Sequence, residues 1–102
     1  MELSIEDFSA AIELDPEDAY LYYLRGRSYS ELRQCEPAIE DSNEAIRLDP
    51  EFAWAYSVIA SCYLSMNETD LYYLYTWKAA QVGYDPFGQF GEPKDWAPDD
   101  RW

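Results

Sequence analysis

A repeat of 34 residues constrains the fold of this chain more than any other feature of its sequence. Residues 11–17 read AIELDPE, and the related motif AIRLDPE returns 34 positions later at residues 45–51. The same shift superimposes Tyr22 on Tyr56, so the register extends well beyond one motif. A period of this length is typical of a solenoid, in which each repeat is one small unit that stacks on the next.

The spacing of aromatic and small residues within one period predicts two helices. Tyr22, Gly26 and Tyr29 recur at steps of four and three, which places them on one helical face. Ala38 and Ala45 belong to a second stripe of small side chains, which allows a neighbouring helix to approach closely. We therefore expect five antiparallel helices, near residues 3–14, 17–33, 37–48, 51–66 and 70–82.

Each Asp-Pro pair is expected to begin a helix. Asp15 precedes Pro16, and Asp49 precedes Pro50. Aspartate is a favoured N-cap, and proline lacks the N–H that the first helical turn leaves unpaired in any case. Pro37 is expected to serve the same purpose for the helix near residues 37–48.

The repeated positions resemble the tetratricopeptide repeat. The matching residues are Tyr22, Gly26, Tyr29, Ala38, Ala45 and Pro50. The resemblance implies an all-α fold, a short α-solenoid of antiparallel helix pairs that form a superhelix. It divides residues 1–86 into a half repeat at 1–16, a full repeat at 19–50 and a divergent repeat at 53–86. An irregular tail rich in Pro, Gly and aromatic residues follows at 87–102.

The resemblance also implies where a partner binds, because the first helices of such repeats line a concave groove. It places six residues along that groove: Tyr20, Tyr23, Arg27, Trp54, Ser57 and Ser61. Steps of three and four residues independently put each set of three on one helical face. Tyr and Trp dominate binding energy at many interfaces when they are accessible. The alternative is that these rings only pack between helices.

The charge of the chain limits its partners. Twenty-one acidic residues against seven basic ones give a net charge of −14, which disfavours nucleic acid and anionic membranes. Within the predicted groove only Arg27 is basic, so a clamp for the carboxylate of a chaperone tail is not expected. We expect a peptide or protein with basic and apolar groups. An acidic mimic of nucleic acid that blocks a basic protein is the less favoured interpretation.

The sequence contains no pattern typical of an enzyme or a metal site. Histidine is absent, and Cys35 and Cys62 do not form a Cys-x-x-Cys pair, so no metal or other cofactor is expected. Without histidine, neither thiol has its commonest activating partner. No signal peptide and no apolar run of membrane-spanning length is evident, so a cytoplasmic location is the default expectation.

Arg25 is expected to have a structural role. It should face the adjacent second helices and pair with Asp7 or Asp41, which would fix the register between repeats.

Both ends of the chain leave alternatives open. The apolar residues of the half repeat, among them Phe8 and Ile12, either cover the next helix or form a contact between two copies of the chain. Self-assembly into a homo-oligomer, through this half repeat or through the C-terminal tail, is therefore the structural alternative to partner binding. In the tail, Phe87, Phe90, Trp96 and Trp102 either insert into a partner or fold back to cap the last helix. The cap is preferred, because it removes apolar area from water.

Overall fold

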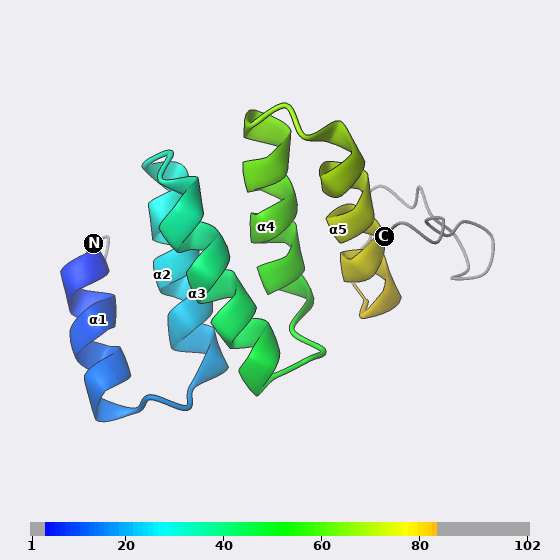
Figure 1. Cartoon of the computed structure of the whole chain (residues 1–102). Coiled ribbons are helices and arrows are strands. Elements are labelled where there is room, and N and C mark those ends of the chain that lie inside the picture. The colour runs from blue at the N-terminus through cyan, green and yellow to red at the C-terminus, as the bar shows by residue number, and fades with distance from the viewer. Residues whose placement is uncertain (1–3, 84–102) are drawn as a thin grey trace.

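The computed structural model describes residues 4–83 of the chain, and these residues form a row of antiparallel helices (Figure 1). The helices are α1 (Ile5–Leu14), α2 (Ala19–Glu31), α3 (Cys35–Leu48), α4 (Ala53–Ser65) and α5 (Thr69–Gln81). Within residues 4–83 there is no strand. The prediction of an all-α helical-repeat fold is therefore confirmed, and each predicted helix boundary lies within two residues of the observed one. The predicted tail at 87–102 lies outside the described residues.

The two Asp-Pro pairs end helices instead of beginning them, so that part of the prediction is wrong. Asp15 is the C-cap of α1 and Asp49 is the C-cap of α3. A proline ring clashes with the residue before it when that residue is helical, which explains why both helices stop at the aspartate. The N-cap of α2 is Asp18, whose carboxylate accepts a hydrogen bond of 3.0 Å from the backbone N–H of Tyr20. The N-cap of α4 is Phe52, which makes no capping bond through its side chain.

The α2–α3 and α4–α5 hairpins close through the same turn. Arg33 and Asn67, 34 residues apart, both have left-handed backbone conformations, with φ of 63° and 62°. In the first turn the backbone N–H of Gln34 donates a hydrogen bond of 2.9 Å to the carbonyl oxygen of Tyr29. In the second turn the N–H of Glu68 donates one of 2.9 Å to the carbonyl oxygen of Tyr63. This closure satisfies carbonyl groups that a helix end leaves unpaired. The sequence period thus corresponds to a repeated backbone geometry.

Small side chains allow α2 and α3 to approach closely at Gly26. A Cβ atom at this position would lie only 3.0 Å from the carbonyl oxygen of Ala38 and 3.0 Å from the Oγ of Ser42. Ala38 and Ser42 are themselves completely buried. Tyr23 of α2 and Cys62 of α4 join the same core cluster, so the core continues from one hairpin into the next.

Arg25 links three helices through its guanidinium group. Its Nε and one terminal nitrogen donate to the two carboxylate oxygens of Asp41 in α3, each at 2.8 Å, and the other donates to Ser9 of α1 at 3.0 Å. The hydrogen bond to Asp41 raises the pKa of Arg25 above its usual value. The sequence predicted Asp7 and Asp41 as alternative partners of Arg25, and the structure confirms Asp41. The Asp7 carboxylate instead completes a capping box with Ser4 at the start of α1.

Replacement of Gly26 tests whether this close contact limits stability. At an ordinary position in a helix interior, alanine stabilises the helix by about 1 kcal/mol relative to glycine. At Gly26 we expect Gly26→Ala to lower the free energy of unfolding by about 1–3 kcal/mol instead, because the added methyl group meets a backbone carbonyl of α3. Urea unfolding followed by circular dichroism measures this change. Arg27→Ala, at the next and exposed position, is the control and should have little effect. A stabilising Gly26→Ala would contradict the interpretation.

Candidate binding groove

Four aromatic rings come together where the N-terminal ends of α2 and α4 lie side by side. We call Tyr20, Tyr23, Phe52 and Trp54 the aromatic cluster. The ring centroid of Tyr23 lies 5.9 Å from Tyr20, 5.2 Å from Phe52 and 5.9 Å from Trp54. The rings of Tyr20 and Phe52 are 6.4 Å apart. Aromatic rings attract one another at these separations.

The members of the aromatic cluster differ in their access to solvent. Tyr20 and Trp54 are 48% and 50% exposed, whereas Tyr23 is only 8% exposed and Phe52 is half-buried. Tyr23 therefore belongs to the core and supports the two outer rings from below. Of the two alternatives for these aromatic residues, packing between helices describes Tyr23, and exposure to solvent describes Tyr20 and Trp54.

The other three residues predicted for the groove extend along the same two helices. Arg27 is exposed, and its Nε lies 3.4 Å from the carboxylate of Glu31 one turn further along α2. The hydroxyl of Ser57 donates a bond of 2.6 Å to the carbonyl oxygen of Trp54. Ser61 is exposed one turn beyond Ser57. The structure thus brings the predicted aromatic residues together, while the polar ones continue away from the cluster.

Sequence reasoning missed Phe52. This residue precedes α4, so the three- and four-residue spacing that located the other rings does not reach it. The 34-residue period contained a signal, because the same shift aligns Phe52 with Asp18, the N-cap of α2. An aromatic residue in place of a capping residue points to a packing role. The ring of Phe52 indeed contacts the ring of Tyr23.

Carboxylates lie in the two loops that lead into the aromatic cluster. Glu17 and Asp18 precede α2, and Asp49 and Glu51 precede α4; Asp18 is half-buried and the other three are exposed. The carboxylate of Asp49 accepts a bond of 3.1 Å from the N–H of Glu51, which holds it against the turn. Each helix N-terminus carries a partial positive charge of roughly half a unit. Four full negative charges outweigh two such ends, so the local field favours a cation.

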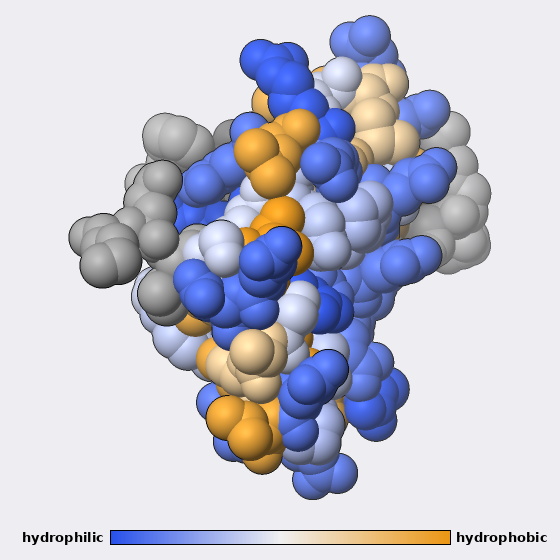
Figure 2. Space-filling view, turned by 90° about the vertical axis from the view of Figure 1, so that its left-hand side faces the viewer, coloured by the Kyte–Doolittle hydropathy of each residue, from blue (hydrophilic) through white to orange (hydrophobic). Residues whose placement is uncertain are grey.

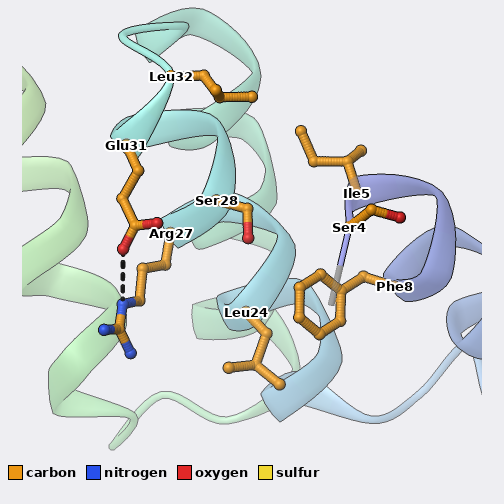
Figure 3. Close-up of a pocket in the computed structure, with 8 residues that line it drawn as sticks. All are labelled: Ser4, Ile5, Phe8, Leu24, Arg27, Ser28, Glu31 and Leu32. Atoms are coloured by element: carbon orange, nitrogen blue, oxygen red, sulfur yellow. Dashed lines mark ion pairs between the residues drawn. The ribbon is translucent and has the colours of Figure 1, made fainter. Parts of the chain in front are cut away.

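A concave feature lies between α1 and α2 (Figure 3). We call it the α1–α2 hollow; its volume is about 350 Å³, and Ser4, Ile5, Phe8, Leu24, Arg27, Ser28, Glu31 and Leu32 line it. Phe8 is buried here against α2, whereas Leu32 at the rim is 59% exposed. Figure 2 views this end of the molecule and shows hydrophobic side chains in separate patches on a largely hydrophilic surface.

The thiol of Cys62 lies in the core of the molecule. Cys62 is buried, and desolvation raises the pKa of its thiol to about 12. The thiol is therefore protonated at neutral pH, whereas a reactive cysteine needs the thiolate. Residues 4–83 contain no group of three His, Cys, Asp or Glu side chains placed to hold a metal ion. In the same part of the chain, no helix is both long enough and apolar enough to cross a membrane.

Antiparallel hairpins that repeat every 34 residues and share one continuous core define a helical-repeat protein. The profile of the tetratricopeptide repeat family matches residues 19–52, which cover α2, α3 and the loop before α4. Residues 19–52 therefore resemble a tetratricopeptide repeat, which supports the resemblance predicted from the sequence for this part of the chain. Repeats of this family generally mediate contacts between proteins and are typically non-catalytic. No curated protein matches this chain. The half repeat at 1–16 and the divergent repeat at 53–86 lie outside the match and stay predictions.

The reactivity of Cys62 can be measured directly. At pH 8 we expect iodoacetamide to label Cys62 in the folded chain at least about a hundredfold more slowly than in the chain unfolded in urea. The reason is that burial raises the thiol pKa from 9.0 to about 12, and each pKa unit lowers the thiolate fraction about tenfold. Mass spectrometry of proteolytic peptides separates Cys62 from Cys35. Equal rates of labelling in the folded and unfolded chains would show that Cys62 is accessible and ionised.

Proposed function

We propose that this protein is a non-catalytic interaction module that binds a peptide or protein segment along the groove of α2 and α4. The groove residues are Tyr20, Tyr23, Arg27, Trp54, Ser57 and Ser61, to which we add Phe52. One observation carries the proposal: two large rings are half exposed while a buried ring supports them. Such rings remove a partner's side chain from water at a low cost in side-chain entropy, because their own positions are already restricted.

The partner that we propose combines basic and apolar groups. The net charge of −14 and the carboxylates beside the aromatic cluster attract cations and repel anions. For the same reason we expect neither nucleic acid nor an anionic membrane to bind. A peptide tail that ends in a carboxylate would need several cations in the groove to bind it. Among the groove residues only Arg27 is basic, and it pairs with the carboxylate of Glu31.

Substitution of the two exposed rings tests the proposal without disturbing the core. A displayed library of random twelve-residue peptides is selected against the wild-type chain, and the affinities of enriched peptides are measured by fluorescence anisotropy. We expect the double variant Tyr20→Ala plus Trp54→Ala to weaken binding at least about tenfold, because exposed Tyr and Trp residues are frequent hot spots. Tyr23 is left intact, because its burial would make a substitution affect folding as well.

Tyr73→Ala is the matched control for this experiment. Tyr73 is 44% exposed, similar to Tyr20, but it lies on α5 and its ring contacts Tyr72 instead of the aromatic cluster. The control variant should bind the peptides as the wild type does. Circular dichroism and thermal melting must show that all variants keep the helical fold. Unchanged affinity in the folded double variant would exclude the groove as the binding site.

Self-assembly is the alternative function, and the α1–α2 hollow favours it. Half of the residues that line this hollow are apolar and half are polar or charged, and the apolar Leu32 at its rim exposes 59% of its surface. A second copy of the chain that covers the hollow would remove this area from water.

The mass in solution distinguishes self-assembly from a monomeric binding module. If copies pair at the hollow, light scattering over a dilution series gives a mass above one chain, and Leu32→Glu restores the monomer by placing a charge in the contact. The groove proposal instead predicts the mass of one chain at every concentration. A larger mass that persists in Leu32→Glu would rule out the hollow as the contact.

A further inference from the structure

Outside the groove, the chain places its own cations over tyrosine rings. The guanidinium carbon of Arg25 lies 5.9 Å from the ring centroid of Tyr22, and the ammonium group of Lys78 lies 4.7 Å from that of Tyr75. Within residues 4–83, no cation of the chain lies over a ring of the aromatic cluster. The cluster therefore offers ring faces to a cation from elsewhere.

The aromatic cluster has dimensions that suit one cation between its outer rings. Tyr20 and Trp54 each lie 5.9 Å from Tyr23, so their centroids are separated by at most twice that distance. A cation on the solvent side of the cluster between these two rings can approach both of them, and cation–π attraction extends to about 6 Å from a ring centroid. Tyr23 below and Phe52 beside these rings keep water away from one side of this position.

The angles between the rings indicate which cation fits. The ring planes of the contacting pairs in the cluster are inclined to one another by only 30° to 41°. None of these contacting pairs is perpendicular, so neighbouring ring faces are inclined to one another at shallow angles. A planar guanidinium stacks on a ring face with little loss of hydration, whereas an ammonium group is compact and strongly hydrated. The geometry therefore favours arginine over lysine.

The charges near the aromatic cluster agree with this choice. Glu17, Asp49 and Glu51 are exposed in the loops that lead into the cluster, and no basic residue lies in those loops. Arg47 near the end of α3 interacts electrostatically with Glu17, but it is paired with Glu44. Arg27, one turn beyond Tyr23 on α2, is paired with Glu31. An incoming guanidinium thus meets a field of opposite sign.

We propose that the groove selects an arginine side chain of its partner, with the guanidinium stacked between the exposed rings of Tyr20 and Trp54. This inference rests on the proposed function and adds the chemical group that the groove recognises. The carboxylates of the two loops provide attraction at longer range, and the rings provide the contact. A basic segment with arginine next to apolar residues is the partner that fits.

A set of three capped peptides tests the inference on the full chain. The probes are GLRLG with acetylated and amidated ends, the same peptide with lysine, and the same peptide with citrulline. Citrulline keeps the shape of arginine but replaces the charged guanidinium by a neutral urea group. NMR titration follows the indole N–H of Trp54 and the backbone amides of residues 20–24 and 53–57. We expect the arginine peptide to bind at least about fivefold more tightly than the citrulline peptide, with lysine between them.

The variants already described complete this experiment. The preference for arginine should disappear in Tyr20→Ala plus Trp54→Ala and persist in Tyr73→Ala. Equal affinities for arginine and citrulline would overturn the inference, and so would shifts confined to the α1–α2 hollow or the absence of any shift. A lysine peptide that binds as tightly as the arginine peptide would overturn the choice of guanidinium. None of these results decides the proposed function, which depends on whether the library peptides lose affinity in the double variant.

Discussion

The close approach of α2 and α3 at Gly26 underlies both the ion pair of Arg25 and the packing around the aromatic cluster. The carbonyl of Ala38 and the hydroxyl of Ser42 lie 3.0 Å from where a Cβ of residue 26 would be, so α3 takes a close position against α2. That position brings Asp41 within hydrogen-bond distance of Arg25, which reaches across to Ser9 of α1. This close contact and the ion pair of Arg25 with Asp41 both join α2 to α3, and the hydrogen bond from Arg25 to Ser9 extends the connection to α1.

The aromatic cluster depends on the same packing. Tyr23 lies on α2 one turn before Gly26, and its buried ring contacts both Phe52 and Trp54. The ring therefore contributes to the core and at the same time supports the proposed binding surface. Tyr20 and Trp54 are half exposed and lie outside the core, so we expect their substitution to leave the core intact.

Periodic patterns predicted most of the fold, and local backbone chemistry explains where they failed. The 34-residue shift and the small side chains around Gly26 located all five helices and the contact of α2 with α3. The Asp-Pro pairs were assigned to the wrong helix end, because aspartate suits both an N-cap and the residue that ends a helix before proline. Phe52 was missed because it precedes α4, where helical spacing carries no information.

The turn that recurs at Arg33 and Asn67 has a consequence for how this chain folds. In each hairpin, a backbone bond to Tyr29 or Tyr63 closes the connection between helices that follow one another in sequence. Packing between helices is similarly local, since α1 and α5 lie at opposite ends of the row (Figure 1). Chains in which most contacts join residues close in sequence lose little conformational entropy when the first contacts form, and they fold rapidly. Either hairpin can therefore act as the nucleus from which ordered structure propagates to its neighbour.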